Sequence, residues 1–313
     1  MPLESGDLED LVDFGLQTIW QYNFLLDKEL ADLGRSLYIP KILKEGTSFA
    51  LKEGTQIKGY ILSSIPKWDS DFLGFDSYVV RDIQYDSHHT LKLLLNHLDE
   101  ILLDRKIRYC YVRVSSESMD TIRSFENNGF TLADIRAMFN RNLHNEPSFP
   151  QVHRGLHFEL ANEEDTEEIA LLSKAVSKQD RFHGDPNFPQ DRADELYYQW
   201  VINGAKSGKD TVKCVVDGEI VGFHMSYPEK YVQKDNISPL SISDLMGVHP
   251  KCGGKGIGTG LFINYFALAE SIGCKHVMAG VHFDNVISLR LHEGVGFKVF
   301  FTEVGLRKWF NHQ

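Results

Sequence analysis

The residues with the clearest chemical content form a glycine-rich loop, Gly253-Gly254-Lys255-Gly256-Ile257-Gly258-Thr259-Gly260, between a strand-like run and an amphipathic helix pattern. Glycines let the backbone approach a ligand closely and adopt positive φ. A helix start offers unpaired N–H groups and the positive end of the helix dipole. The loop therefore predicts a cradle for a phosphate group. The alternative is a glycine-rich connection that holds no ligand.

Two common phosphate-binding patterns do not match this loop. A P-loop has a glycine five residues before the position of Gly254, where this chain has His249, and a Ser or Thr after Lys255, where it has Gly256. A dinucleotide fingerprint that starts at Gly256 needs a third small residue at position 261, which is Leu261. We therefore expect a phosphate ligand of another kind.

The elements that position the loop recur along the chain. An ungapped offset of 167 residues aligns the stretch from Asp86 to Phe130 with the stretch from Gly253 to Phe297. Both copies show a helix pattern, a strand-like run, a short helix and a Gly-Phe pair. The aligned identities are Val114/Val281, Arg123/Arg290, Glu126/Glu293, Gly129/Gly296 and Phe130/Phe297.

Periodicity predicts the elements within each copy. The first has an apolar helix stripe from Leu91 to Leu102 and a strand at 109–114. The second has a helix stripe from Leu261 that stops at Gly273, then a strand at 276–281. We expect two domains of one fold, 1–148 and 149–313, with the joint in the polar stretch 142–155.

The first copy lacks the glycines. At the positions aligned with the loop it has Asp86-Ser87-His88-His89-Thr90-Leu91, with a carboxylate where a phosphate would approach. We therefore expect this half to bind no phosphate ligand of this kind. It is interpreted as a degenerate copy that serves packing and forms one wall of the substrate site.

Composition narrows the classes of function. The chain has 313 residues, 33 basic and 44 acidic, a net charge of −11, with 42% hydrophobic and 25% charged residues. These values indicate an ordered globular protein and exclude collagen and coiled coil. An acidic chain is a poor candidate for tracking nucleic acid, and no strong attraction to anionic membranes is expected.

Location and metal chemistry are predicted from absent patterns. The first ten residues show no secretory signal and no apolar stretch approaches a membrane span, so we expect a cytoplasmic protein. Its four cysteines, Cys110, Cys214, Cys252 and Cys274, have no C-x-x-C spacing. This predicts reduced thiols without a disulfide framework, and no metal site.

The order strand, glycine loop, helix, strand, Asn285, short helix and Gly296-Phe297 resembles the acetyl-CoA-binding core of the GNAT acyltransferase superfamily. The loop pattern of that family is Arg/Gln-x-x-Gly-x-Gly/Ala. Gly256 and Gly258 match the two small positions, whereas Gly253 stands where the family has Arg or Gln. The resemblance covers the second half well and the first more weakly. It implies an α/β fold of two tandem GNAT-like domains, each a twisted mixed sheet flanked by helices.

The resemblance also implies a coenzyme A site. Backbone N–H groups from Gly254 to Gly258, continuing to Thr259 and Gly260, would hold the pyrophosphate. The pantetheine arm would lie along the strand at 245–248 like an added strand. An N–H near Met246 or Val248 would stabilise the oxyanion of the acyl group. The candidate coenzyme A residues are Met246, Val248, Gly253, Gly254, Lys255, Gly256, Ile257, Gly258, Thr259, Gly260, Asn285 and Ser288.

The acid and base roles follow from the same resemblance. The family usually has a Tyr acid seven residues after the Asn, and counting from Asn285 places His292 there. Asn285, Ser288 and His292 share one helix face, and an imidazolium can supply a proton near neutral pH. The alternative is a spacer histidine, with water or another residue as the acid.

Asp244 begins the strand that leads into the loop, where relatives often carry an acid that relays a proton from the amine through water. The other interpretation of Asp244 is a strand-edge carboxylate that faces solvent. His183 and Asp185 are further candidates for the base.

An aromatic and charged stretch from Asp180 to Trp200 marks the acceptor side. Together with 68–75 and 306–310 it resembles the dTDP-fucosamine acetyltransferase-like family, which N-acylates nucleotide-linked amino sugars and has a degenerate first domain. Aromatic rings suit stacking on a base or sugar, and an arginine suits a pyrophosphate. The candidate acceptor residues are Trp68, Arg181, Phe182, His183, Asp185 and Tyr227.

The sequence thus predicts an acyl-CoA-dependent N-acyltransferase that moves an acetyl or longer acyl group to the amine of a dTDP- or UDP-linked deoxyamino sugar by direct attack. The partners expected are the coenzyme A thioester and the nucleotide sugar, with a possible homodimer. Two alternatives stay open. One is acylation of another small amine, such as an aminoglycoside, an amino acid or a peptide N-terminus, and the other is a non-catalytic coenzyme A-binding module.

Overall fold

The computed structural model describes residues 1–3, 7, 10–11, 14, 39–44, 47–144, 155–178, 180–229 and 240–310. These residues divide into two compact units. The first contains the described residues up to Ile135 together with 301–310. The second contains the described residues from Arg136 to Phe300.

The first unit is a mixed sheet with helices. Its strands lie in the order β1-β2-β3-β4-β11, and only β3 and β4 are parallel. A core of leucines from α5 packs on this sheet together with Phe125 of α6. The strands are β1 Phe49–Glu53, β2 Gln56–Ser64, β3 Ser77–Tyr85, β4 Tyr109–Ser115 and β11 Lys298–Trp309, and the helices are α3 Ile39–Leu43, α4 Lys67–Leu73, α5 His88–Asp104 and α6 Met119–Asn127.

The second unit repeats this architecture. Its strands lie in the order β5-β10-β9-β8-β7-β6, and only β9 and β10 are parallel. The strands are β5 Thr131–Asn142, β6 His157–Leu160, β7 Asp210–Val216, β8 Glu219–Glu229, β9 Leu240–Val248 and β10 His276–His282. The helices are α7 Thr166–Val176, α8 Gln190–Lys206, α9 Ile257–Ser271 and α10 Val286–Gly294, with 3-10 turns η4 Glu163–Asp165 and η5 Pro250–Cys252.

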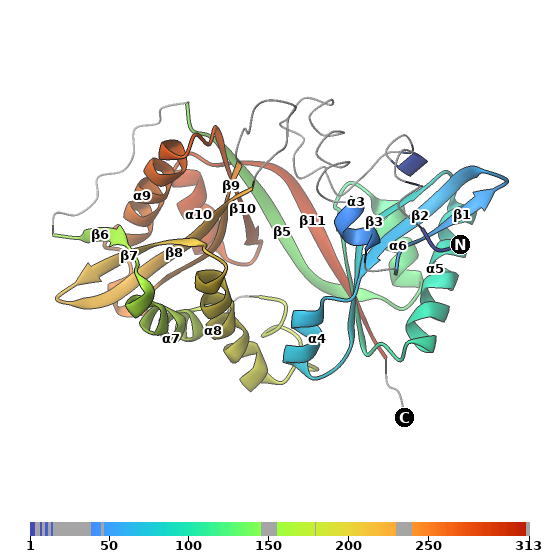
Figure 1. Ribbon diagram of the computed structural model, residues 1–313, viewed down its shortest axis with the longest axis horizontal. Helices are drawn as coiled ribbons and strands as arrows, with labels where there is room; N and C mark the ends of the chain where they lie inside the picture. Colours follow the sequence, from blue (N-terminus) through green and yellow to red (C-terminus); the bar gives the residue numbers. More distant parts are fainter. Residues whose placement is uncertain are drawn as a thin grey trace. The chain divides into compact units, whose positions relative to one another are not determined.

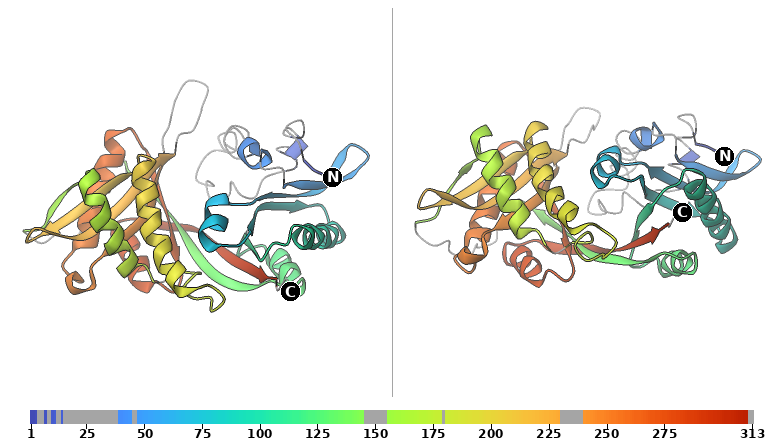
Figure 2. Two further views of the ribbon diagram at one scale, coloured as in Figure 1. Left: turned by 60° about the horizontal axis from the view of Figure 1, so that its bottom comes forward. Right: turned by 90° about the horizontal axis from the view of Figure 1, so that it is seen from below.

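Two helices cover each face of the second sheet (Figures 1 and 2). Val277, Ala279 and Val281 of β10 join the core with α9, so the alternating residues of this strand face α7 and α8. Leu245 of β9 packs in the other core, with α7 and α8. The faces matter because the candidate residues divide between them.

The elements confirm the internal repeat. From β4 onward, every boundary of the first copy recurs 167 residues later: β4 in β10, α6 in α10 and β5 in β11. The helix before each of these strands also packs in the same way. A Cβ at Gly59 would meet Thr90 and Leu94 of α5, and one at Gly222 would meet Ile257 and Leu261 of α9, the residues 167 later. Glycine on the neighbouring strand lets each helix approach its sheet closely.

The last strand of each copy pairs in the opposite unit. β5 pairs with β10 from Asn142↔His276 onward, and β11 pairs with β4 from Trp309↔Tyr109 onward. These two registers are equivalent under the 167-residue offset. The compact units therefore change at Ile135 and Phe300, not at the predicted joint after residue 148. Most of the predicted linker, 145–154, lies outside the described residues.

The cysteines carry no disulfide. All four are free thiols, and Cys110, Cys214 and Cys274 are buried in the apolar cores. In the described ranges, no group of three or more His, Cys, Asp or Glu side chains could hold a metal ion. No described helix combines the length and apolar character needed to cross a bilayer.

Candidate active site

The start of α9 is an anion-binding helix terminus. Gly256 is the N-cap residue, with φ 78°, and Gly254 has φ 75°, so both adopt the left-handed conformation that glycine allows. The first printed bond of the helix runs from the Gly260 N–H to the Gly256 carbonyl. Because the cap has no side chain, the N–H groups of Ile257, Gly258 and Thr259 are left for a ligand.

Three of the loop glycines have different tasks. Gly254 has nothing within 4 Å of a built Cβ, and it is exposed, as are Gly253 and Lys255. A Cβ at Gly258 would lie 2.8 Å from Leu291 of α10, and one at Gly260 would overlap the Phe158 ring. Gly260 is therefore a packing glycine whose N–H is already donated, which contradicts its predicted place in the phosphate cradle.

β9 and β10 part beside this loop. Their parallel pairing runs from Leu240↔His276 to Ser243↔Ala279, yet β9 continues to Val248. The other edge of β9 stays paired with β8 up to Val248. The edge of β9 that leads into the loop is thus open to an added strand, as the pantetheine prediction requires. Met246 and Val248 are half-buried against the core with α9.

A β-bulge places Asp244 at the point where the strands part. In the pairing with β8, Ser243 and Leu245 have consecutive partners and Asp244 has none. The extra residue turns its carboxylate toward α8. There the Oδ2 atom accepts 2.9 Å from the indole N–H of Trp200 and 2.6 Å from the ammonium of Lys209.

Asp244 is therefore no solvent-facing strand-edge residue, since its side chain is 10% exposed and ion-paired. The Lys209 ammonium also lies 4.6 Å from the Tyr227 ring, which brings that predicted residue into the same group. A stack of rings continues away from Asp244 along α8. Trp200 stacks on Tyr197 at 6.0 Å, and Tyr197 stacks on His183 at 6.1 Å.

His292 lies in an aromatic core. Its ring is 6% exposed and contacts Phe139, Phe262 and Phe297 at 4.8 to 5.2 Å. Burial lowers the pKa of His292 to about 4, although a 2.8 Å contact from Nδ1 to the Ser288 carbonyl opposes the shift. The ring is therefore neutral near pH 7, with Nδ1 as the donor. This contradicts the expected imidazolium acid.

Asn285 begins α10. Its side-chain oxygen accepts from the Ser288 N–H at 3.0 Å, an N-cap contact. Ser288 in turn contacts His292, so the structure brings the three predicted residues together on one helix face. Their printed contacts stabilise the helix.

Sequence reasoning missed a second buried histidine. His224 of β8 is fully buried, and its Nε2 lies 2.8 Å from the Oγ of Ser243, the last residue of β9 paired with β10. Burial and the neighbouring His292 lower the pKa of His224 to about 3. Its ring lies 5.2 Å from Phe262, which also contacts His292. Nothing in the local sequence pattern distinguished this histidine from an ordinary strand residue.

The predicted acceptor loop is held by its own contacts. Phe182 and Asp185 are buried, and Asp185 accepts from the N–H and side chain of Asn187. His183 is clamped between Asp180 at 2.5 Å and Asp194 at 2.9 Å. These contacts contradict the prediction that Phe182 and Asp185 face a substrate.

Two predicted acceptor residues keep exposed surface. The Arg181 guanidinium lies 4.4 Å from the Phe182 ring, and half-buried Arg181 stays a prediction. Trp68 belongs to α4 of the first unit, where it is 39% exposed and stacked on Phe72 at 5.5 Å. Its predicted role in the acceptor site likewise stays a prediction.

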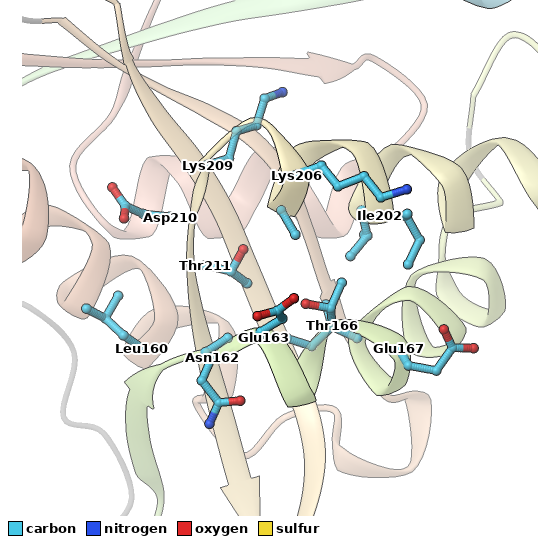
Figure 3. Close-up of a pocket in the computed structure, with 14 residues that line it drawn as sticks. Leu160, Asn162, Glu163, Thr166, Glu167, Ile202, Lys206, Lys209, Asp210 and Thr211 are labelled. Carbon is cyan, nitrogen blue, oxygen red and sulfur yellow. The ribbon is translucent and has the colours of Figure 1, made fainter.

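A cavity of about 670 Å³ lies elsewhere in the second unit, between the start of α7 and the end of α8 (Figure 3). None of the predicted site residues lines it. Burial raises the pKa of Asp210, one of its lining carboxyls. Lys209 also lines the cavity, but its ammonium points away from the other labelled side chains, toward the Asp244 contact already described.

The site geometry agrees with the comparison with protein families. Residues 174–297, which include β9, the glycine loop, α9, β10 and α10, match the acetyltransferase (GNAT) family model. The second half of the chain is a GNAT acetyltransferase domain. The loop, the open edge of β9 and the α10 cap all lie inside this GNAT match. Acetyltransferases of this family use acyl-CoA.

Relatives extend the likeness beyond that domain. The chain is 26% identical over 258 residues to the spore coat polysaccharide biosynthesis protein SpsD of Bacillus subtilis, covering 80% of this chain and 83% of that protein. A mycothiol acetyltransferase of Acidothermus cellulolyticus is 35% identical over 96 residues, 28% of this chain and 29% of that enzyme.

Solved structures share the duplicated fold. A tandem GNAT protein from the clavulanic acid biosynthesis pathway aligns with a TM-score of 0.61 at 12% identity, covering 100% of this chain and 98% of that one. The predicted fold of two tandem GNAT-like halves is thereby confirmed.

Proposed function

We propose that this GNAT acetyltransferase transfers an acetyl or longer acyl group from acyl-CoA to the amine of a nucleotide-linked deoxyamino sugar, by direct attack. The observation that carries the coenzyme A site is the contrast between the two helix starts. α9 begins at a glycine cap that leaves three N–H groups for an anion. The equivalent helix α5 begins at Ser87, whose Oγ accepts from the Thr90 N–H at 3.2 Å.

The first repeat supports this assignment further. Thr90 also donates to Asp86 at 2.6 Å, and this hydrogen bond lowers the pKa of the Asp86 carboxyl. A carboxylate held ionised at the helix start repels a phosphate. We therefore assign coenzyme A to the second unit alone.

In that unit each step of the transfer has a group. The N–H groups from Gly254 to Thr259 bind the pyrophosphate, and the open edge of β9 receives the pantetheine. An N–H of β9 near Met246 or Val248 polarises the thioester carbonyl, because preorganised backbone donors stabilise a developing oxyanion.

Asp244 is assigned to the amine. Trp200 and Lys209 hold its carboxylate on the α8 face beside the parting of β9 and β10. There it takes up the ammonium proton, directly or through water, and frees the nitrogen for attack. His292, buried and neutral, has no part in this step.

The acceptor class rests on similarity. The relative that spans most of the chain is named for polysaccharide biosynthesis, in which activated amino sugars are building blocks. The stacked rings of His183, Tyr197 and Trp200 offer a flat aromatic surface on the α8 side of Asp244.

The test is release of free coenzyme A thiol with a panel of dTDP- and UDP-linked amino sugars crossed with several acyl-CoAs. Turnover restricted to nucleotide amino sugars supports the proposal. Turnover only with an aminoglycoside, an amino acid or a peptide amine would replace the acceptor class. Binding of coenzyme A with no turnover on any amine would indicate a binding module.

A further inference from the structure

A charge reversal separates the two repeats at one position of the sheet. Arg113 of β4 and Gly280 of β10 are equivalent, 167 residues apart, on equivalently paired strands. Glu303 of β11 and Arg136 of β5 are equivalent on the exchanged strands that pair with them. The arginine and its carboxylate in the first unit thus become a glycine and an arginine in the second.

In the first unit this position is filled and neutralised. The Arg113 guanidinium lies 2.7 Å from Asp134 and 3.6 Å from Glu303, and its side chain is 17% exposed. The Tyr111 ring lies 5.2 Å away. A buried charge needs such partners, and two carboxylates supply them.

In the second unit the same position is open. Gly280 is exposed, and a Cβ built on it would lie 2.8 Å from Nη2 of Arg136, so the guanidinium lies over the backbone of Gly280. Nη2 donates to the Sδ of Met138 at 3.3 Å, a weak acceptor. The residue equivalent to Asp134 is Phe301, so neither acid of the first unit has an acidic counterpart.

This arginine lies beside the proposed reaction site. Gly280 follows Ala279, the last residue of β10 that pairs with β9, and Asp244 follows its partner Ser243. Alternation along β5 and β10 puts Arg136 on the sheet face opposite the core with Phe139 and Ala279. That is the α8 face, to which the bulge also turns Asp244.

We propose that Arg136 determines acceptor specificity by binding a phosphate oxyanion of the acceptor. The proposal rests on the proposed function, whose nucleotide sugar carries a pyrophosphate. A planar guanidinium donates two parallel N–H groups to such an oxyanion, which a lysine does not match. Because β5 follows the first repeat, that half then supplies a residue of the acceptor site in addition to its packing role.

The test compares Arg136→Gln and Arg136→Lys with the unchanged enzyme. Loss of a charged hydrogen-bond pair raises the KM for the nucleotide sugar by about tenfold to a hundredfold in Arg136→Gln, with partial recovery in Arg136→Lys. The kcat and the Kd of acetyl-CoA stay within about twofold, since the substituted group contacts neither. The control is Arg123→Gln, an exposed arginine on α6, which leaves all three values unchanged.

Binding probes separate the two proposals. Titration calorimetry uses dTDP, UDP and glucosamine 1-phosphate, the last to distinguish a sugar phosphate from a nucleotide diphosphate. Weaker binding of any of these to Arg136→Gln supports the arginine assignment even if no nucleotide amino sugar is turned over. Equal binding to both proteins, or no binding of any probe to the unchanged enzyme at millimolar concentration, overturns it.

Discussion

Trp200 of α8 donates its indole N–H to the Oδ2 of Asp244 at 2.9 Å, across the face of the sheet where β9 leaves β10. The same oxygen accepts from Lys209 at 2.6 Å. Two donors on one oxygen fix the orientation of the carboxylate. This arrangement makes Asp244 the group in the second unit best placed to meet an incoming ammonium.

Asp244→Asn is expected to lower kcat by about 10²- to 10⁴-fold, the usual loss when a general base is removed. The amide keeps the acceptor for Trp200, so the fold and the Kd of acetyl-CoA should change little. Steady-state kinetics and calorimetry measure the two effects. The matched control is Asp210→Asn, a neighbouring carboxyl in the separate cavity, and it should retain full activity.

Trp200→Phe tests the orientation of the carboxylate. Phenylalanine keeps the ring that stacks on Tyr197 but loses the N–H. A loss of about tenfold in kcat is expected, the equivalent of one hydrogen bond of about 1.4 kcal/mol. A loss as large as that of Asp244→Asn would show that the tryptophan does more than orient the carboxylate.

Gly254→Ala and Gly273→Ala form a matched pair for the coenzyme A loop. Both glycines have positive φ, 75° and 82°, with nothing within 4 Å of a built Cβ. Each alanine should therefore lower the free energy of unfolding by about 1 kcal/mol, from backbone strain alone. Only Gly254→Ala should weaken acetyl-CoA binding, by about tenfold. Equal effects of both variants on the Kd would remove the cradle assignment.

The sequence predicted the repeat well because each element is a local pattern. The stop at Gly273 and the strand before Gly280 depend on neighbours a few residues away, and both appear where expected. The exchange of β5 and β11 was not predictable in this way. Each strand carries the same pattern whether it pairs with β4 or β10, and that choice depends on long-range packing.

The site divides along the same line. The helix start at Gly256 is a local feature and was predicted. The bulge at Asp244 depends on its pairing with β8, and the neutral state of His292 depends on burial by Phe139 from a distant strand. Arg136 was not predicted, since its place beside Gly280 exists only after the strand exchange.

His292→Phe tests the role of the buried histidine. The equivalent residue in the first repeat is Phe125, which packs against Phe130 at 4.9 Å, so the ring should fit. Because His292 is neutral near pH 7, the kcat of His292→Phe should stay within a few-fold of the unchanged enzyme. A drop of about a hundredfold or more would restore the acid role.

The same variant should change the pH dependence of stability. Folding lowers the pKa of His292 to about 4 and that of His224 to about 3, from 6.5. The unfolded chain therefore binds protons that the folded chain refuses. Stability is fully present above pH 6.5 and falls as the pH drops toward 4, by at most about 1.4 kcal/mol per pH unit for each histidine. His292→Phe should remove one histidine's share of that slope, measured by urea unfolding at several pH values.

Binding of acetyl-CoA should occur at one site per chain, because only α9 has an open start. Ser87→Ala removes the cap of α5 and should lower the free energy of unfolding by about 1 kcal/mol. The control, His89→Ala at an exposed neighbouring position, should cost much less. Neither variant should change the calorimetric stoichiometry, since the Asp86 carboxylate still repels phosphate. A second binding event in the unchanged enzyme would show that the first repeat retains a coenzyme A site, whereas one that emerges only in Ser87→Ala would show that the cap alone had closed it.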